Sequence, residues 1–209
     1  MRKTILIAIS LMPILIVGGC IAIDRMGGAY THDPEEAEFL MSDAAQALVD
    51  KAYADIETGE LRDYHTHLIT IGTSGSGGAV HPHMLDWKHP IARMKSAVYM
   101  SGAGVDDLDN ADAQYITRLV RLVRSMPGHG RHFILAFDQH YNADGTVNKD
   151  KTEFYTPNSY IFEVAEKYPD IFIPAISVHP YRLDALEALE KWHDKGARLI
   201  KWLPNAQGM

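Results

Sequence analysis

The fold is decided by the stretch His132-Phe133-Ile134-Leu135-Ala136-Phe137-Asp138, a continuous apolar run closed by an aspartate. A run of this length is typical of a strand that is buried on both faces of a parallel sheet. Strands are also predicted over residues 62–71, 171–178 and 197–203, and residues 97–102 are a candidate for a fifth strand.

Helical segments separate these strands. Residues 109–126 place apolar side chains at the spacing of one helical face and end at Pro127-Gly128, and helices are also predicted over 157–168 and 184–195. Strands that alternate with helices at this spacing specify right-handed βαβ units and a parallel sheet. The sequence therefore predicts an α/β fold.

The composition narrows the class of protein. The chain has 209 residues, of which 46% are hydrophobic and 22% charged, as in a globular domain. Its formal net charge of −7 and the absence of any Lys/Arg run argue against nucleic acid as a partner. The single cysteine, Cys20, excludes an intramolecular disulfide and a zinc ribbon. The 11 histidines indicate nitrogen and oxygen ligands for any bound metal.

Residues 1–23 have the features of an export segment. Arg2 and Lys3 precede an apolar run, and Val17-Gly18-Gly19-Cys20 resembles a lipoprotein processing site. Two alternatives are open: cleavage with lipid attachment at Cys20, or an uncleaved anchor, since about 20 apolar residues cross a bilayer. In both cases the positive N-terminal end predicts that the remainder lies on the outer side of the cytoplasmic membrane. Residues 24–60 are expected to form a helical lead-in, and residues 61–209 the α/β domain.

The chemistry centres on Asp63-Tyr64-His65-Thr66-His67-Leu68. Two histidines separated by one residue on a strand point to the same side and can share one metal ion, such as zinc, iron or manganese. The alternative is a pair of strand histidines that are satisfied by hydrogen bonds. The position of the pair on the first strand of an alternating α/β pattern favours the metal site, because functional side chains gather at the carboxyl ends of such strands.

The chain resembles the amidohydrolase superfamily, in the branch that includes aminocarboxymuconate-semialdehyde decarboxylase. The resemblance covers residues 61–209 and rests on the motif at 63–68, on Ile176-Ser177-Val178-His179-Pro180, and on the segment from Gly196 to Pro204. It implies a (β/α)₈ barrel of TIM type, of which only the N-terminal half is present, with His65 and His67 as metal ligands. In the family, further histidines from the fifth and sixth strands and an aspartate from the eighth, which often serves as general base, complete the site. Those residues would lie beyond Met209, so the chain is expected to be truncated.

Two further residues enter through the resemblance. Lys201 lies where some branches carry a carboxylated lysine that bridges two metals, and the alternative is a substrate-facing or salt-bridged lysine. His179 is expected to be a metal ligand or substrate contact, or else a hydrogen-bonded histidine at the end of a strand.

The function that the resemblance implies is a metal-dependent hydrolase, in which metal-activated water attacks an amide, ester or related bond of a small molecule, with zinc as the expected metal. A metal-dependent decarboxylase on the same scaffold is a close alternative. A second class of function is an envelope-anchored remnant that binds a ligand without turnover.

Other candidate motifs are weaker. The glycine-rich run 72–78 lacks the ending of a P-loop, and a mobile loop beside the metal site is favoured over nucleotide binding. His81 and His83 form a second His-x-His pair. Because Pro82 stands between them and the segment is predicted to be a loop, they do not share a strand face, and a solvated loop is favoured. The polar residues flanking the strand near Phe133 are candidates for lining a pocket or for hydrogen-bonding loops, and they are His129, His132, His140 and Asp138.

Overall fold

The computed structural model describes Pro34 and residues 41–209. The export segment 1–23, Cys20 and the start of the helical lead-in lie outside the described residues. Within the described part of the chain, no helix is both long and apolar enough to span a membrane. The described residues group into two units, residues 82–106 and the remainder, and each is considered by itself.

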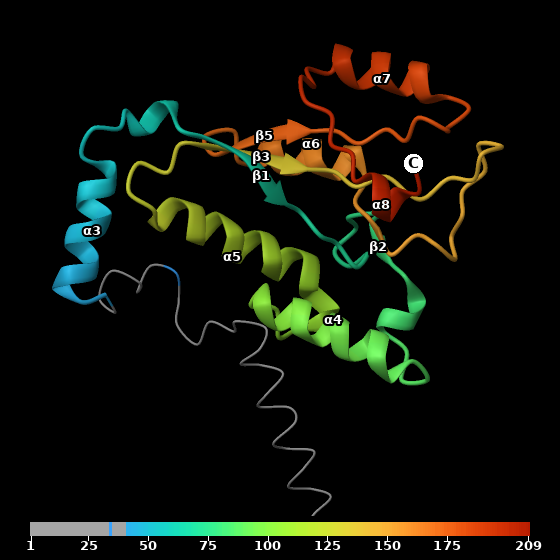
Figure 1. Cartoon of the computed structure of the whole chain (residues 1–209), viewed down its shortest axis with the longest axis horizontal. Coiled ribbons are helices and arrows are strands. Elements are labelled where there is room, and N and C mark those ends of the chain that lie inside the picture. The colour runs from blue at the N-terminus through green and yellow to red at the C-terminus, as the bar shows by residue number, and fades with distance from the viewer. Residues whose placement is uncertain (1–33, 35–40) are drawn as a thin grey trace, which may run out of the picture. The chain divides into compact units, whose positions relative to one another are not determined.

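The larger unit is built on a parallel sheet of three strands in the order β1-β3-β5 (Figure 1). The strands are β1 (Arg62–His67), β3 (Arg131–Leu135) and β5 (Phe172–Ala175). Their register pairs His67 with Leu135 and Leu135 with Ala175. An irregularity between Asp63 and Thr66 interrupts the pairing of β1. The predicted α/β class with parallel strands is confirmed, and the described residues do not form a closed barrel.

A fourth parallel segment follows β5. It consists of a single bridge between Ile176 and Ile200, in place of the strand predicted over 197–203. The prediction that β3 is buried on both faces is also wrong in part. Ile134 and Leu135 are buried, but Phe133 is only half-buried and stacks on Tyr64 with 4.8 Å between the ring centroids. One face of the sheet is therefore more open than the sequence indicates.

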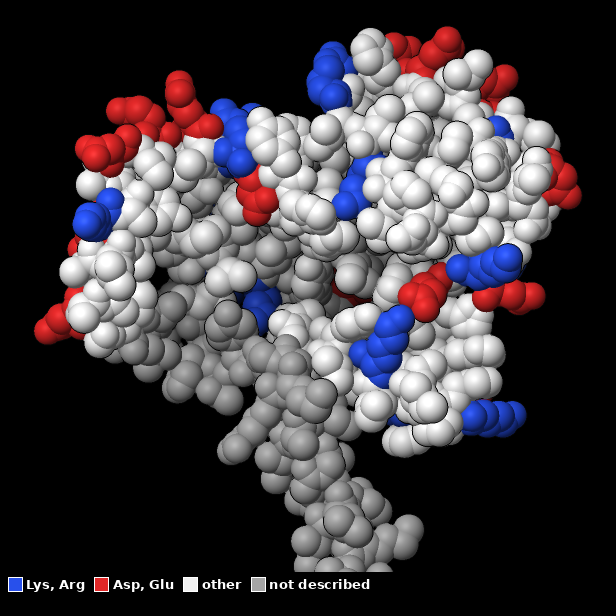
Figure 2. Space-filling model, in the orientation of Figure 1, with Lys and Arg blue, Asp and Glu red and all other residues white. Residues whose placement is uncertain are grey.

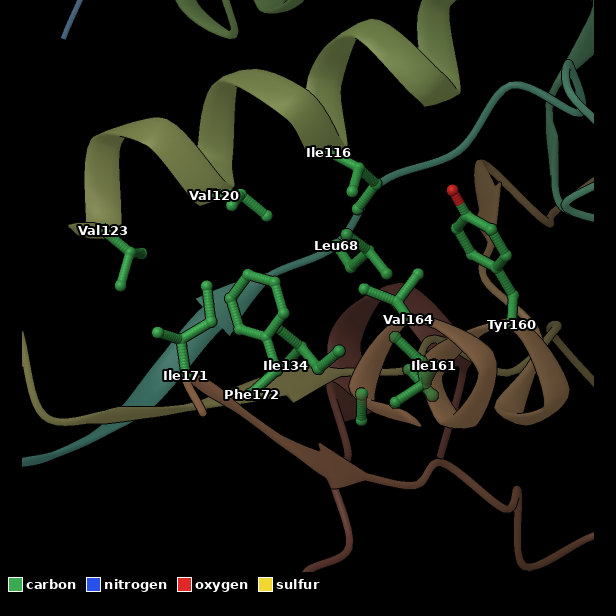
Figure 3. Packing of buried hydrophobic residues seen from close by; sticks show 12 residues of the cluster. Leu68, Ile116, Val120, Val123, Ile134, Tyr160, Ile161, Val164, Ile171 and Phe172 are labelled. Atoms are coloured by element: carbon green, nitrogen blue, oxygen red, sulfur yellow. The ribbon is translucent and has the colours of Figure 1, made fainter. Parts of the chain in front are cut away.

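Two helices cover the other face of the sheet, α5 (Ala111–Ser125) and α6 (Asn158–Lys167). Both lie where the apolar periodicity predicts them. Figure 3 shows their apolar side chains meeting those of the strands in one core. Buried members of this core include Leu68, Ile116, Val120, Val123, Ile134, Ile161, Val164, Ile171 and Phe172.

The helix α7 (Ala185–Asp194) packs a second cluster against the end of β5. Phe162 of α6 and Trp192 of α7 stack there with ring centroids 5.2 Å apart. Gly196, with φ +104°, ends this helix as predicted, because glycine adopts the left-handed region without a steric penalty. The helix α3 (Asp43–Tyr53), capped by Ser42, belongs to the predicted lead-in and buries none of its residues.

Small elements complete the larger unit. Strands β2 (Ala79–Val80) and β4 (Phe154–Tyr155) form an antiparallel pair that the sequence analysis did not predict. The short helices here are η2 (Thr58–Glu60), η4 (Leu108–Asn110) and α8 (Pro204–Gln207).

The smaller unit contains η3 (Pro82–Met84) and α4 (Pro90–Gly102). The candidate strand at residues 97–102 is wrong, because these residues are the second half of α4. Pro90 at the first turn favours helix initiation, and the following Ala, Arg, Met and Lys residues have high helix propensity.

The glycine-rich run 72–78 is held by one buried carboxylate. Asp112 of α5 accepts hydrogen bonds from the backbone N–H groups of Ile71 and Gly72 at 2.7 and 3.1 Å, and from the hydroxyl of Ser76 at 2.6 Å. The N–H of Asp112 donates in turn to the Thr73 hydroxyl. These bonds draw the chain away from the sheet after His67, so β1 ends earlier than predicted.

Candidate functional site

The two histidines of β1 lie side by side. The Nε2 atoms of His65 and His67 are 2.9 Å apart, and the ring centroids are 4.8 Å apart. A hydrogen bond from the backbone N–H of His65 to Asp63 Oδ1, 2.7 Å long, fixes the local backbone next to the irregularity in β1. The structure therefore brings together the two side chains that the His-x-His spacing predicts to share one side.

Lys201 reaches the same point from the fourth parallel segment. Its Nζ lies 3.3 Å from His65 Nε2, although the two residues are 136 positions apart in sequence. The backbone N–H of Lys201 donates to the Ile176 carbonyl at 2.7 Å, which ties its strand segment to β5. A flat sheet would separate the first and fourth segments by roughly 14 Å, at about 4.8 Å per strand. The contact therefore requires that both side chains converge over one face of the sheet.

Hydrogen bonds within the cluster do not use all the donors and acceptors of these three groups, which also face solvent. An ammonium only donates, and Nε2 of a neutral imidazole carries either one hydrogen or one lone pair. If His65 Nε2 donates to His67, the Lys201 ammonium faces an N–H group. If His65 Nε2 instead accepts from Lys201, its lone pair is no longer available to His67. The cluster of His65, His67 and Lys201 thus carries more polar capacity than its members use.

The surroundings of His67 favour its neutral form. Burial lowers the pKa of His67 below its ordinary value, and the neighbouring Lys201 and His65 lower it further. A neutral imidazole offers the lone pair that a metal requires. Its surroundings therefore favour the form of His67 that can coordinate a metal.

His179 occupies a different environment. It is fully buried, and both of its ring nitrogens are engaged: the N–H of Tyr181 donates to Nδ1 at 3.1 Å, and Nε2 lies 2.9 Å from the Gln207 carbonyl. Because a carbonyl only accepts, His179 carries its hydrogen on Nε2. Among the described residues, no group of three His, Cys, Asp or Glu side chains is arranged to hold an ion. The two hydrogen bonds of His179 agree with the alternative of a hydrogen-bonded histidine at the end of a strand.

Asp138 organises the surroundings of His179. Its buried carboxylate accepts from the backbone N–H groups of His179 and Gln139, both at 2.8 Å, and from Arg182 at 3.1 Å. Arg182 also bonds Asp184 through two nitrogens at 2.8 Å each. Burial, together with Asp138, raises the pKa of Tyr141 to about 12. Asp138 is therefore the hydrogen-bonding residue that one of its two sequence interpretations predicts.

The helix α8 provides further hydrogen bonds to the residues around Asp138 and His179. The side chain of Gln207 donates to the Asp138 carbonyl and the Ser177 hydroxyl, and its oxygen accepts from the N–H of Leu203. Sequence reasoning missed Gln207 and Arg182. Only the closeness of Arg182 to the His179-Pro180 pair could have drawn attention to it.

Other histidines make contacts of their own. His132 is buried, with Nδ1 near Thr66 and Asp63 and Nε2 near the His129 carbonyl. In the smaller unit His83 stacks on His89, with centroids 3.5 Å apart. A groove of about 660 Å³ runs between α7 and residues 197–200, and its lining does not include the β1 pair.

Comparisons with known proteins give no relative for this chain: no family model matches it, and neither a curated protein nor a solved structure is significantly similar.

Proposed function

We propose that this chain carries part of a divalent-metal site of amidohydrolase type and acts as a metal-dependent hydrolase on a small molecule. The observation that carries the proposal is the convergence of His65, His67 and Lys201 over one face of a parallel sheet. Such convergence agrees with a sheet that curves as a (β/α)₈ barrel does, in which side chains of separate strands meet inside the barrel. We therefore include in the proposal that residues 61–209 form the N-terminal half of such a barrel.

The histidine pair fits a metal ion. Two nitrogens bound at about 2.0–2.1 Å to one tetrahedral ion lie about 3.3 Å apart. The observed Nε2–Nε2 separation of 2.9 Å is within a few tenths of an ångström of that value. Two imidazoles suit zinc, and a catalytic ion also needs further ligands and a position for water or substrate. The resemblance assigns the further ligands to later strands of the barrel.

The chemistry that a bound divalent ion supplies is a water molecule whose pKa is lowered towards neutrality, and thus a nucleophile at physiological pH. His65 and His67 would hold the ion. With the His65 lone pair bound to an ion, the Lys201 ammonium would have no acceptor there and would be available to the substrate. A positive charge at that place stabilises negative charge that develops on the substrate.

The same lysine favours a carbon–carbon lyase as the second candidate. A cation within 3.3 Å of a ligand nitrogen is well placed to bind a substrate carboxylate, which a decarboxylase requires. The bridging, carboxylated form of Lys201 is the remaining alternative. It replaces the positive charge by a negative one and would favour two ions over one.

The proposal also concerns location. Residues 1–23 are proposed to tether the domain to the cell envelope on the outer side of the cytoplasmic membrane, through lipid on Cys20 or as an uncleaved anchor. Incorporation of labelled palmitate into the wild type and not into a Cys20→Ala variant would identify the lipoprotein. Membrane retention without incorporation would identify the anchor.

Metal content of the purified full chain tests the metal site. We expect close to one equivalent of zinc by plasma mass spectrometry in the wild type and almost none in the double variant His65→Ala, His67→Ala. The matched control is His81→Ala, His83→Ala, which removes a His-x-His pair of the same spacing outside β1 and should keep its zinc. A folded wild type that binds no metal would overturn the proposal and leave the non-catalytic ligand-binding function.

A further inference from the structure

The strand β1 contains one residue more than the part of β3 that it pairs with. Asp63 lies opposite His132. Three positions later Thr66 lies opposite Ile134, which is only two positions beyond His132. This is the pattern of a β-bulge, in which two residues of one strand face a single residue of its neighbour. His65 is one of the two residues in the bulge.

The bulge decides which face of the sheet carries the histidines. Side chains alternate between the two faces of a strand, and a slip of one residue reverses them. If the register before the bulge continued, His65 would lie opposite Ile134. His67 would lie opposite Ala136, and both of these partners are fully buried in the core with α5 and α6. With the bulge His67 pairs with Leu135 instead, and both histidines reach the more open face of the sheet.

The carboxylate of Asp63 holds the bulge. Its Oδ1 accepts the backbone N–H of His65 at 2.7 Å, and His65 has no partner on β3 in the register. Its Oδ2 accepts from the Thr66 hydroxyl at 3.2 Å and lies 3.4 Å from Nδ1 of the buried His132. One oxygen therefore binds a residue inside the bulge, and the other binds the first residue beyond it.

A different residue holds His67. The hydroxyl of Tyr115, on α5, donates to the His67 carbonyl at 2.7 Å. The backbone beyond the bulge is therefore fixed without Asp63. The separation of 2.9 Å between the two Nε2 atoms then depends on how His65 is placed, and its backbone N–H is bound by Asp63.

We propose that Asp63 is a positioning residue of the metal site, which fixes the backbone of His65 in the bulge and so sets its imidazole beside that of His67. This inference rests on the proposed function, in which the two histidines bind an ion. Residues that orient metal ligands typically cost about 10–100-fold in metal affinity when they are replaced.

Two substitutions separate the hydrogen bond of Asp63 from its charge. Asp63→Asn keeps an oxygen acceptor for the His65 N–H and removes the charge. Asp63→Glu keeps the charge, but its longer side chain moves the carboxylate away from that N–H. Asp and Glu side chains gather over α3 and the segment that leads from it to β1 (Figure 2), so the charge lost in Asp63→Asn is one of several there.

The zinc dissociation constant of the purified full chain, measured by competition with a chromogenic chelator, tests the proposal. We expect Asp63→Ala and Asp63→Glu to raise this constant by about tenfold or more, and Asp63→Asn to leave it close to the wild-type value. The matched control is Asp144→Ala, because Asp144 also accepts the N–H two residues further on, that of Thr146 at 2.9 Å, in a loop outside β1. Wild-type affinity in Asp63→Ala, or affinity kept by Asp63→Glu and lost by Asp63→Asn, would overturn the proposal.

A second readout does not need the metal. NMR of the metal-free full chain in detergent, with labelled histidine, should show a nuclear Overhauser contact between the rings of His65 and His67. We expect Asp63→Ala to lose this contact and Asp63→Asn to keep it. A contact that persists in Asp63→Ala would overturn the role of Asp63. A wild type that shows the contact and binds no zinc would overturn the metal site instead.

Discussion

The two histidine clusters of the larger unit differ in how completely their hydrogen bonds are satisfied. Around His179 every ring nitrogen has a partner of the correct type, and the buried carboxylate of Asp138 accepts three hydrogen bonds. Around His65 and His67 three polar groups compete for too few lone pairs on a half-open face. The first arrangement stabilises the fold, and the second leaves donors and acceptors that do not bond one another. The two clusters should therefore respond to substitution in opposite ways.

The largest effect is expected at the satisfied cluster. Asp138→Ala leaves Arg182 and two backbone N–H groups without their acceptor, which should lower the free energy of unfolding by about 3 kcal/mol. Urea denaturation measures the change. The control is Asp184→Ala, the exposed partner of the same arginine, which should lose less than about 1 kcal/mol. Equal losses in the two variants would contradict a special role for the buried carboxylate.

The next effect belongs to the open cluster and appears only with metal. Zinc at about 100 times its dissociation constant should add about 2.7 kcal/mol to the stability of the wild type, because it binds the folded state alone. Thermal unfolding with and without zinc checks this. The variant His65→Ala, His67→Ala should gain nothing, and a gain equal to that of the wild type would place the metal elsewhere.

The two clusters can be compared directly by replacing one histidine in each and measuring the stability of the metal-free protein. His179→Ala leaves the Tyr181 N–H and the Gln207 carbonyl unpaired in the interior, and we expect a loss of about 2 kcal/mol. His65→Ala removes an exposed side chain from a crowded cluster and should change stability by less than about 0.5 kcal/mol. Denaturant midpoints measured in chelator decide the comparison, and similar losses would mean that the open cluster is structural.

The smallest effect is electrostatic. Lys201→Met should raise the pKa of His67 in the metal-free protein, because the positive charge of Lys201 helps to lower it. Titration of the imidazole signals by NMR measures the change. Since the folded-state pKa of His67 lies below its ordinary value of 6.5, its contribution to stability is present above pH 6.5 and is lost as the pH falls through the folded-state pKa. This acid-side loss should be smaller in Lys201→Met, and an unchanged pKa would rule out a close Lys201 ammonium.

Part of this architecture could be predicted from sequence because it depends on local periodicity. The helical faces of α5 and α6 and the glycine after α7 follow from apolar spacing and turn chemistry. The same-side placement of His65 and His67 follows from strand geometry. Lys201 was singled out only through the family resemblance, since nothing local indicates a partner 136 residues away.

What could not be predicted depends on tertiary contacts. The end of β1 is set by Asp112, which accepts hydrogen bonds from the glycine-rich loop. In the sequence Asp112 looks like an ordinary aspartate in the first turn of a helix, and nothing local indicates this contact. The partners of His179 come from α8, whose short sequence has no distinctive periodicity. Residues 97–102 read equally well as strand or helix until Pro90 is taken as a helix start.

The contact between His65 and Lys201 has a consequence for biosynthesis. At roughly 5–20 residues per second, the ribosome needs about 7–27 seconds to make the chain between them. During that interval the growing chain contains both histidines but not yet Lys201. An ion acquired by the growing chain would be held by two imidazoles alone, and the positive charge beside it would arrive only after the fourth segment joins β5.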